Sequence, residues 1–268
     1  MRIRVLFDEA AVQGRVSALA AEIAAAHRHE PPLVIGILNG AVPFMMDLLK
    51  ALPAAWRDRQ EFDFYDATSY DGRVMDRAGL PGLTGTRWLA IRLGGRPRTL
   101  ERLTREATRL CEDGGASSIE TLEGADAADF WRKLADFGWR PEDAIGVAVR
   151  FSVPPSNVQQ LVDSISSAQY PGFEPAVVAH PGYGNVMAYW FPNDGEASMD
   201  SAKSVVALAR SAARAAGGSA IVERCSVETK TGIDIWGDVG GPRAIMTRLK
   251  EQYDPDGVLN PGRYVGGI

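Results

Sequence analysis

Apolar side chains recur with helical or strand-like periods along most of the chain. Residues 12–23 place them at helical spacing. The continuous apolar run 33–38 is typical of a strand buried on both faces. The spacing in 44–52 predicts a second helix, and 62–65 predicts a second strand. This order of helix, strand, helix and strand predicts an α/β fragment with a partial parallel sheet over residues 1–72.

The next stretch interrupts these patterns. Between Asp71 and Gly82 the chain contains three glycines and a proline, and no period is sustained. Such punctuation is typical of a boundary between structural units. We therefore predict a linker at residues 73–82.

From residue 83 to residue 268, strand-like and helical patterns alternate. The predicted strands are 88–93, 144–153, 176–179, 186–191 and 219–224, and the predicted helices begin near Thr99, Phe130, Val158, Ala202 and Pro242. No strand is followed by a glycine-rich phosphate fingerprint, which disfavours a Rossmann fold. The pattern predicts an α+β domain, with an antiparallel or mixed sheet and helices on one face.

Composition narrows the function classes. The net charge of −5 argues against a nucleic-acid partner. Cys111 and Cys225 are too few for a disulfide scaffold, and they indicate a reduced, cytoplasmic setting. The first eight residues lack the apolar core of a signal peptide. No apolar run has the length of a membrane span.

The turn Leu38-Asn39-Gly40 follows the apolar run and opens a helix. Backbone N–H groups at such a turn can bind an anion, although a tight turn that needs glycine explains Gly40 equally well. The segments V-I-G-I-L-N-G-A-V-P-F-M-M-D-L-L and D-F-Y-D-A-T-S-Y-D-G resemble the first part of hypoxanthine-guanine phosphoribosyltransferases. The resemblance implies a pyrophosphate loop at Leu38, Asn39 and Gly40, and a mobile-loop pair at Ser69 and Tyr70.

The same resemblance implies phosphoribosyl pyrophosphate and Mg²⁺ as ligands. However, the family also has an acidic D-D-x-x-D-T-G-like turn after an apolar strand, and nothing after Gly72 supplies one. Without that turn neither the ribose hydroxyls nor Mg²⁺ would be held. Phosphoribosyl transfer is therefore not expected, although binding of a phosphorylated ligand stays open.

Several segments after residue 83 resemble a second family. They read W-L-A-I-R-L-G-G-R-P, V-R-F-S-V-P-P-S, G-G-S-A-I-V-E-R, D-I-W-G-D and, near the end, D-P-D-G-V-L-N-P-G-R. Together they resemble the C-terminal cap domain of FAD-linked oxidases of the vanillyl-alcohol-oxidase type, in the branch of glycolate oxidase and D-lactate dehydrogenase. The resemblance implies FAD as cofactor, contacts from Asn260, Pro261, Gly262 and Arg263, and two-electron oxidation of a 2-hydroxy acid.

In that family a separate N-terminal domain holds most of the flavin, and no such domain is recognisable here. The resemblance therefore implies a partner subunit that brings a flavin domain. Two other interpretations stay open. One is a phosphoribosyltransferase-like binder, and the other is an inactive fusion of two incomplete domains.

Three residues are candidates for substrate binding. Arg150 lies among apolar neighbours on a predicted strand, where it needs a carboxylate from a substrate or, as we prefer, from an internal Asp or Glu. His180-Pro-Gly-Tyr-Gly-Asn185 resembles the H-x-G-x-G-N-x-H turn of the D-lactate dehydrogenase branch, but Met187 replaces the second histidine. His180 is therefore expected to be a packed turn residue rather than a metal ligand. No metal site and no catalytic residue are predicted.

Overall fold

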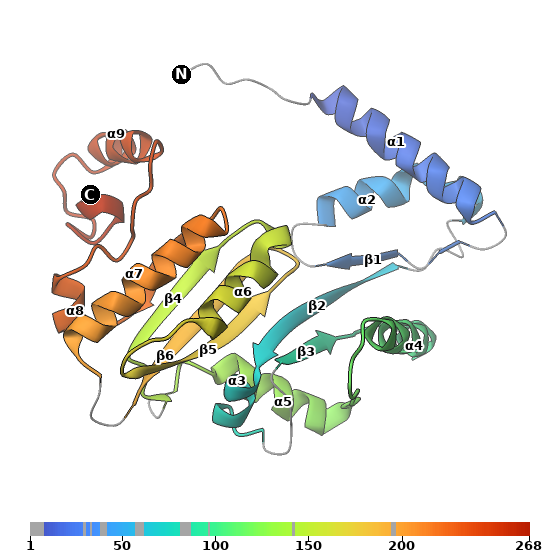
Figure 1. The fold of residues 1–268 in the computed structure, drawn as a ribbon. Helices are drawn as coiled ribbons and strands as arrows, with labels where there is room; N and C mark the ends of the chain where they lie inside the picture. The colour runs from blue at the N-terminus through green and yellow to red at the C-terminus, as the bar shows by residue number, and fades with distance from the viewer. Residues whose placement is uncertain are drawn as a thin grey trace. The chain divides into compact units, whose positions relative to one another are not determined.

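The computed structural model divides the chain into two compact units (Figure 1). Unit 1 comprises Met1–Ala67 and Ile91–Thr121, and unit 2 comprises Thr68–Ala90 and Leu122–Ile268. The structure describes residues 8–28, 31–32, 34–37, 42–56, 62–80, 87–95, 97–140, 143–193 and 197–268. Each unit has its own cluster of buried apolar side chains.

Unit 1 is built mainly from helices. Its elements are α1 (Glu9–Ala26), β1 (Val34–Ile37), α2 (Val42–Ala51), η1 (Ala54–Trp56), the first part of β2 (Phe62–Asp71) and α4 (Pro97–Asp113). The Asp8 side chain accepts a hydrogen bond from the N–H of Ala11 at 2.8 Å and so caps α1. Val16 and Ala20 of α1 pack against Leu48 of α2.

The pairing of the strands in unit 1 can be compared with the predicted parallel sheet. β1 pairs in parallel with β2, from Val34 opposite Phe62 to Ile37 opposite Tyr65. The other strand pairs whose register is described are antiparallel. A phosphoribosyltransferase-like parallel sheet is therefore not shown within the described residues.

Unit 2 is organised around an antiparallel sheet. Its strands are β4 (Val147–Ser152), β5 (Phe173–His180), β6 (Asn185–Pro192) and β7 (Ser219–Arg224), in the order β5-β6-β4-β7. The end of β2 lies beside β5, and β3 (Arg87–Arg92) pairs with β2. Side chains alternate between the two faces of each strand. This arrangement is consistent with the predicted α+β cap domain.

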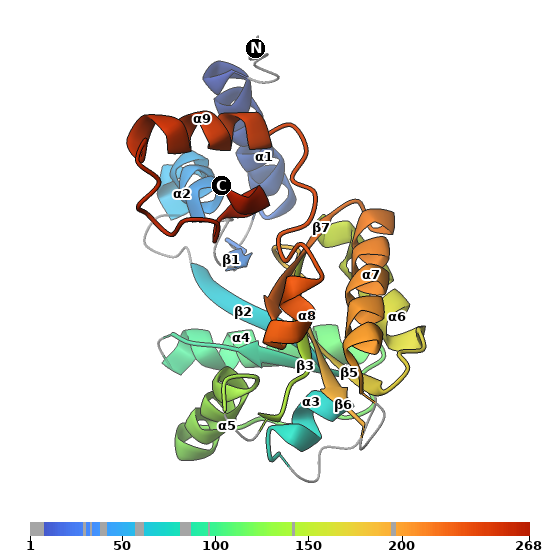
Figure 2. The same ribbon diagram turned by 90° about the vertical axis from the view of Figure 1, so that its left-hand side faces the viewer.

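One face of this sheet is fully covered. Figure 2 shows α6 (Val158–Ser167) and α7 (Met199–Ala215) along the same side of the strands. Phe151 and Trp190 from the sheet are fully buried there, together with Leu161 from α6 and Val205 from α7. The apolar spacing of both helices matches this role because i, i+3 and i+4 positions share a helix face.

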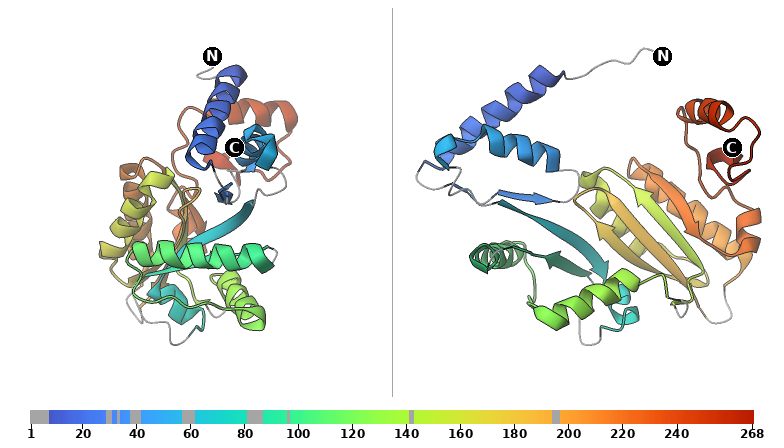
Figure 3. Two further views of the ribbon diagram at one scale, coloured as in Figure 1. Left: turned by 90° about the vertical axis from the view of Figure 1, so that its right-hand side faces the viewer. Right: turned by 180° about the vertical axis from the view of Figure 1, so that it is seen from behind.

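The opposite face is only partly covered, by α3 (Gly72–Arg77) and α5 (Gly124–Asp136) (Figure 3). Leu134 of α5 and Phe137 just after it pack against Tyr189 and Phe191. Phe137 meets Tyr189 edge to face, with ring centroids 5.1 Å apart. The expectation of helices on a single face is therefore incomplete, since both faces carry helices.

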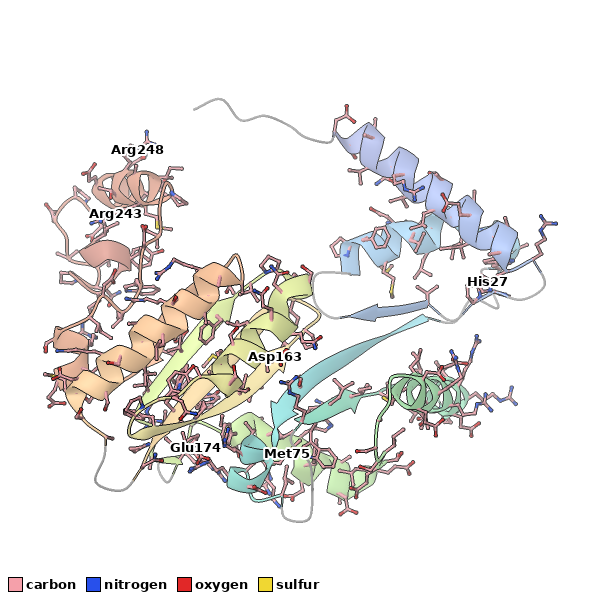
Figure 4. The ribbon with its side chains drawn as sticks, viewed as in Figure 1. His27, Met75, Asp163, Glu174, Arg243 and Arg248 are labelled. Atoms are coloured by element: carbon pink, nitrogen blue, oxygen red, sulfur yellow. The ribbon has the colours of Figure 1, made fainter. Side chains whose placement is uncertain are left out.

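The segment predicted as a linker also differs from expectation. Residues 72–77 form α3, and the side chains of Val74 and Met75 are 0% and 1% exposed. Figure 4 labels Met75 on α3 and Glu174 on β5, and these two elements are in contact. The sequence did not predict this helix, because it lies in a glycine-rich stretch and only a few of its side chains are apolar.

The rest of unit 2 consists of short elements and a C-terminal segment. These are η3 (Pro155–Asn157), α8 (Val227–Thr231), α9 (Arg243–Tyr253) and η4 (Val265–Gly267). α9 buries none of its side chains. Among the helices of the described chain, none combines the length and apolar character needed to cross a bilayer.

Candidate functional site

Beyond α3 and α5, the partly covered face of the unit 2 sheet carries polar side chains. Strand register places Arg150 opposite Met187, and His180 opposite Asn185. Alternation puts these residues on the same face as Tyr189, and all four are partly exposed. With Glu223 of β7, they form what we call the open face.

Arg150 and Glu223 form an ion pair on the open face. The Arg150 Nε donates to Glu223 Oε1 at 2.5 Å, and the two side chains are 39% and 41% exposed. Arg150 thus has the internal carboxylate that the sequence analysis preferred. An ion pair this exposed contributes little stability, so its main effect is to fix the orientation of the guanidinium.

A β-bulge in β7 positions Glu223. Val149 lies opposite Val222, whereas Ala148 lies opposite Arg224, so Glu223 is the extra residue between them. A bulge sets two residues of one strand against a single residue of its neighbour. Sequence reasoning missed Glu223, because a bulge leaves no periodic signal in a strand of six residues.

His180 is held at the end of β5 by two neighbours. Its Nδ1 lies 3.0 Å from Oγ1 of Thr68, whose residue is 1% exposed. Its ring stacks on Tyr183 with centroids 5.2 Å apart. These contacts suit a packed turn residue. Thr68, another residue that the sequence analysis missed, becomes recognisable only when β2 is seen beside β5.

The turn between β5 and β6 is fixed by Gly184. Its φ is +73°, and a Cβ there would lie 1.9 Å from the carbonyl oxygen of Val153. The N–H of Val153 also donates to the Gly184 carbonyl at 2.9 Å. Only glycine fits this left-handed conformation and close approach. The turn therefore holds His180 and Asn185 in register.

Asn185 has an unusual environment. Its Oδ1 is buried and has no hydrogen-bond partner within the described part of the chain. A buried acceptor without a donor carries a desolvation cost of about 1–3 kcal/mol. Asn185 therefore carries an acceptor for which the described residues supply no donor.

The C-terminal segment is organised by Asp254. Its carboxylate accepts from the N–H groups of Val258 at 2.9 Å and Leu259 at 3.0 Å, and it pairs with Lys250. The hydrogen bond from Lys250 lowers the pKa of Asp254 most, and these two backbone N–H groups add to the shift. These contacts tie the end of α9, at Tyr253, to the turn that follows it.

The predicted cofactor residues Asn260, Pro261, Gly262 and Arg263 form an exposed turn. Asn260 has a φ of +48°, and its carbonyl accepts from the Arg263 N–H at 3.1 Å. Nothing in these contacts identifies a cofactor, so their role stays a prediction.

The predicted pyrophosphate loop, Leu38, Asn39 and Gly40, lies outside the described residues. Ser69 and Tyr70 lie in strand β2, opposite Ala179 and Val178, and therefore not in a loop as the resemblance implied. No group of three His, Cys, Asp or Glu side chains suited to a metal occurs in the described ranges. Mg²⁺ therefore has no support from the structure.

Two buried tyrosines predict how stability depends on pH. Burial raises the pKa of Tyr170 to about 12, and burial, with smaller contributions from Asp143 and Glu223, raises that of Tyr189 to about 12. The unfolded chain loses these protons near pH 10, so the free energy of unfolding falls between about pH 10 and 12. We expect Tyr189→Phe to flatten this fall in urea denaturation curves. An unchanged slope would contradict the assignment.

Comparison with known proteins gives matches to two groups. The family model "FAD linked oxidases, C-terminal domain" matches residues 42–223. The hypoxanthine-guanine phosphoribosyltransferase of Bacillus subtilis (strain 168) is 40% identical over 72 residues, which are 27% of this chain and 38% of that protein. The corresponding enzyme of Streptococcus agalactiae serotype V is 35% identical over 69 residues, covering 26% of this chain and 36% of its own length.

These phosphoribosyltransferase matches are short. The chain spans little more than a third of those two relatives. The family match begins well before residue 83 and ends before Asn260. It includes Arg150, His180, Asn185 and Glu223, and it covers more than half of the chain. The chain therefore belongs to the family of FAD-linked oxidases, as a bearer of their C-terminal domain.

Proposed function

We propose that unit 2 is the substrate-facing cap of an FAD-linked oxidoreductase that acts on a 2-hydroxy acid. One observation carries the proposal. The same sheet face presents an oriented guanidinium, at Arg150, and an acceptor without a described donor, at Asn185 Oδ1. A 2-hydroxy acid offers the two complementary groups, a carboxylate and a hydroxyl donor.

The Arg150 guanidinium suits a carboxylate ligand. Glu223 engages its Nε, which leaves the two terminal nitrogens as a planar fork. Such a fork binds a carboxylate through two parallel charge-assisted hydrogen bonds. Lysine has one ammonium group and lacks this geometry. Glu223 thus presents the fork to a ligand and keeps it from rotating away.

Asn185 supports recognition of the hydroxyl. It stands opposite Ser152, two positions along β4 from Arg150, so the two side chains occupy diagonal positions on one face. A hydroxyl that donates to Oδ1 would remove the cost of the unpaired acceptor. Met187, which faces Arg150 across the strands, supplies an apolar surface beside them.

A bound flavin would supply the two-electron oxidant. In this proposal a partner subunit would hold the flavin, and the open face would bind the substrate. The chain's own residues bind the carboxylate, orient the hydroxyl and exclude water.

The proposal is tested by titrating the full ¹⁵N-labelled chain with lactate and with propionate, which lacks the hydroxyl. We expect saturable shifts around Met187 with lactate. Arg150→Lys should weaken both ligands by about tenfold, the value of one charge-assisted hydrogen bond. Asn185→Ala should lower the affinity for lactate to about that for propionate, and it should leave the affinity for propionate unchanged.

Arg15→Lys is the matched control, because Arg15 forms an exposed pair with Glu22 in unit 1. It should leave both titrations unchanged. Lactate binding that is absent, or that survives Arg150→Lys at full strength, would contradict the proposal.

The sequence identity to phosphoribosyltransferases over about 70 residues supports a second candidate function. This is the binding of a phosphorylated ribose at Leu38-Asn39-Gly40. Calorimetry with phosphoribosyl pyrophosphate tests it directly. Binding should disappear in Gly40→Val and persist in Gly14→Val, since Gly14 has open space around it. If neither lactate nor phosphoribosyl pyrophosphate binds, the inactive fusion remains as the interpretation.

A further inference from the structure

A separate pocket lies at the other end of the partly covered face in unit 2. It has a volume of about 200 Å³ and is lined by Arg77, Arg140, Asp143, Ala144 and Phe191. Pockets for drug-sized ligands measure about 300–1,000 Å³, so this one suits a much smaller ligand. None of its lining residues belongs to the open face.

Arg77 is held flat against one wall. Its Cζ lies 3.8 Å from the centroid of the Phe191 ring, a cation–π contact. Its described ion pair is with Glu174, at 3.5 Å, and Arg73 binds that same carboxylate more closely, at 2.7 Å. Arg77 is therefore oriented by the ring while its charge is only weakly neutralised.

Arg140 is fixed more rigidly. Its Nε and Nη2 donate to Asp143 Oδ1 at 3.1 and 2.7 Å, and Nη2 also donates to the Arg77 carbonyl at 2.7 Å. Asp143 is itself anchored by the N–H groups of Gly138 and Arg140. Asp143, with a side chain 3% exposed, thus serves as an internal support that positions Arg140.

Charge and backbone strain both mark this pocket. The described side chains in or beside it include three arginines (73, 77 and 140) and two carboxylates (Asp143 and Glu174). The chain as a whole carries −5. Ala144 in the wall has a φ of +42°, a left-handed conformation that is costly for alanine. Such strain clusters at binding sites.

We propose that this pocket binds a small oxyanion between the guanidinium groups of Arg77 and Arg140. Planar guanidinium groups match the oxygens of phosphate and of carboxylate. The pocket does not depend on the proposed 2-hydroxy acid site, because the two share no residue.

The test is a ¹⁵N NMR titration of the full chain with inorganic phosphate and, separately, with acetate at equal ionic strength. We expect saturable shifts at Gly138 and Ala144 with at least one of the two ions. Arg77→Gln should weaken that binding at least tenfold, and Arg77→Lys should recover part of it. The comparison of the ions assigns the site to phosphate or to carboxylate.

Arg132→Gln is the control, since it removes one exposed charge from α5 that is paired with Asp129 and lies outside the pocket. It should leave the titration unchanged. The proposal is overturned if neither ion gives saturable shifts, or if Arg132→Gln weakens binding as much as Arg77→Gln does. Retained wild-type amide spectra in both variants exclude unfolding as the cause of any loss.

Discussion

Gly184→Ala is expected to destabilise unit 2 by at least about 3 kcal/mol, among the largest effects of a single methyl group. The new Cβ would meet the Val153 carbonyl oxygen at 1.9 Å, and the residue would keep a φ of +73°. The clash is between the new Cβ and backbone atoms of Val153, which cannot move aside as the end of a flexible side chain could. Urea denaturation of the purified variant measures the loss.

Two other glycines separate the causes of this effect. Gly79 has the same φ of +73° with nothing within 4 Å of its Cβ position, so Gly79→Ala should cost only about 1–2 kcal/mol. Gly218 would place its Cβ 2.1 Å from the Ser152 carbonyl oxygen without a positive φ. Gly218→Ala should therefore show the clash alone. Equal losses at Gly79 and Gly184 would contradict this account of the turn.

Val74→Asp is expected to destabilise unit 2 by about 4 kcal/mol or more, because it buries an unpaired carboxylate. Val74 is 0% exposed and belongs to the cluster that includes Phe137 and Tyr189. A true linker would tolerate the change. Thermal unfolding followed by near-ultraviolet circular dichroism reports both the stability and the packing of these aromatic rings.

Val227→Asp is the matched control, because Val227 is 73% exposed and the substitution is identical. It should change the free energy of unfolding by no more than about 0.5 kcal/mol. If Val74→Asp were equally mild, α3 would not be part of the folded core of unit 2.

The strands of unit 2 were predictable because their apolar content is high. The predicted strand 186–191 falls within β6, and 219–224 coincides with β7. The long apolar stripe of α7 was equally clear. α3 was not, because its buried residues Val74 and Met75 sit between Arg73 and Asp76, and they are buried by contacts with distant strands.

The candidate site was predictable only in part. Arg150, His180 and Asn185 were found from a charged residue in an apolar strand and from a glycine-rich turn. Their partners Glu223 and Thr68 come from strands far away in the sequence, and the pairing that joins them is set by sheet register. A single sequence contains no signal for such register, because many alignments of short strands bury similar apolar area.

The bulge at Glu223 has a consequence for how β7 tolerates changes in length. Deleting this residue would restore an uninterrupted ladder, in which Val222 still opposes Val149 and Arg224 still opposes Ala148. Every other side chain of β7 would keep its face. Glu223 is thus the residue of this strand that the sheet itself does not require, and a shorter homologous strand would lose the anchor of Arg150 while retaining the fold.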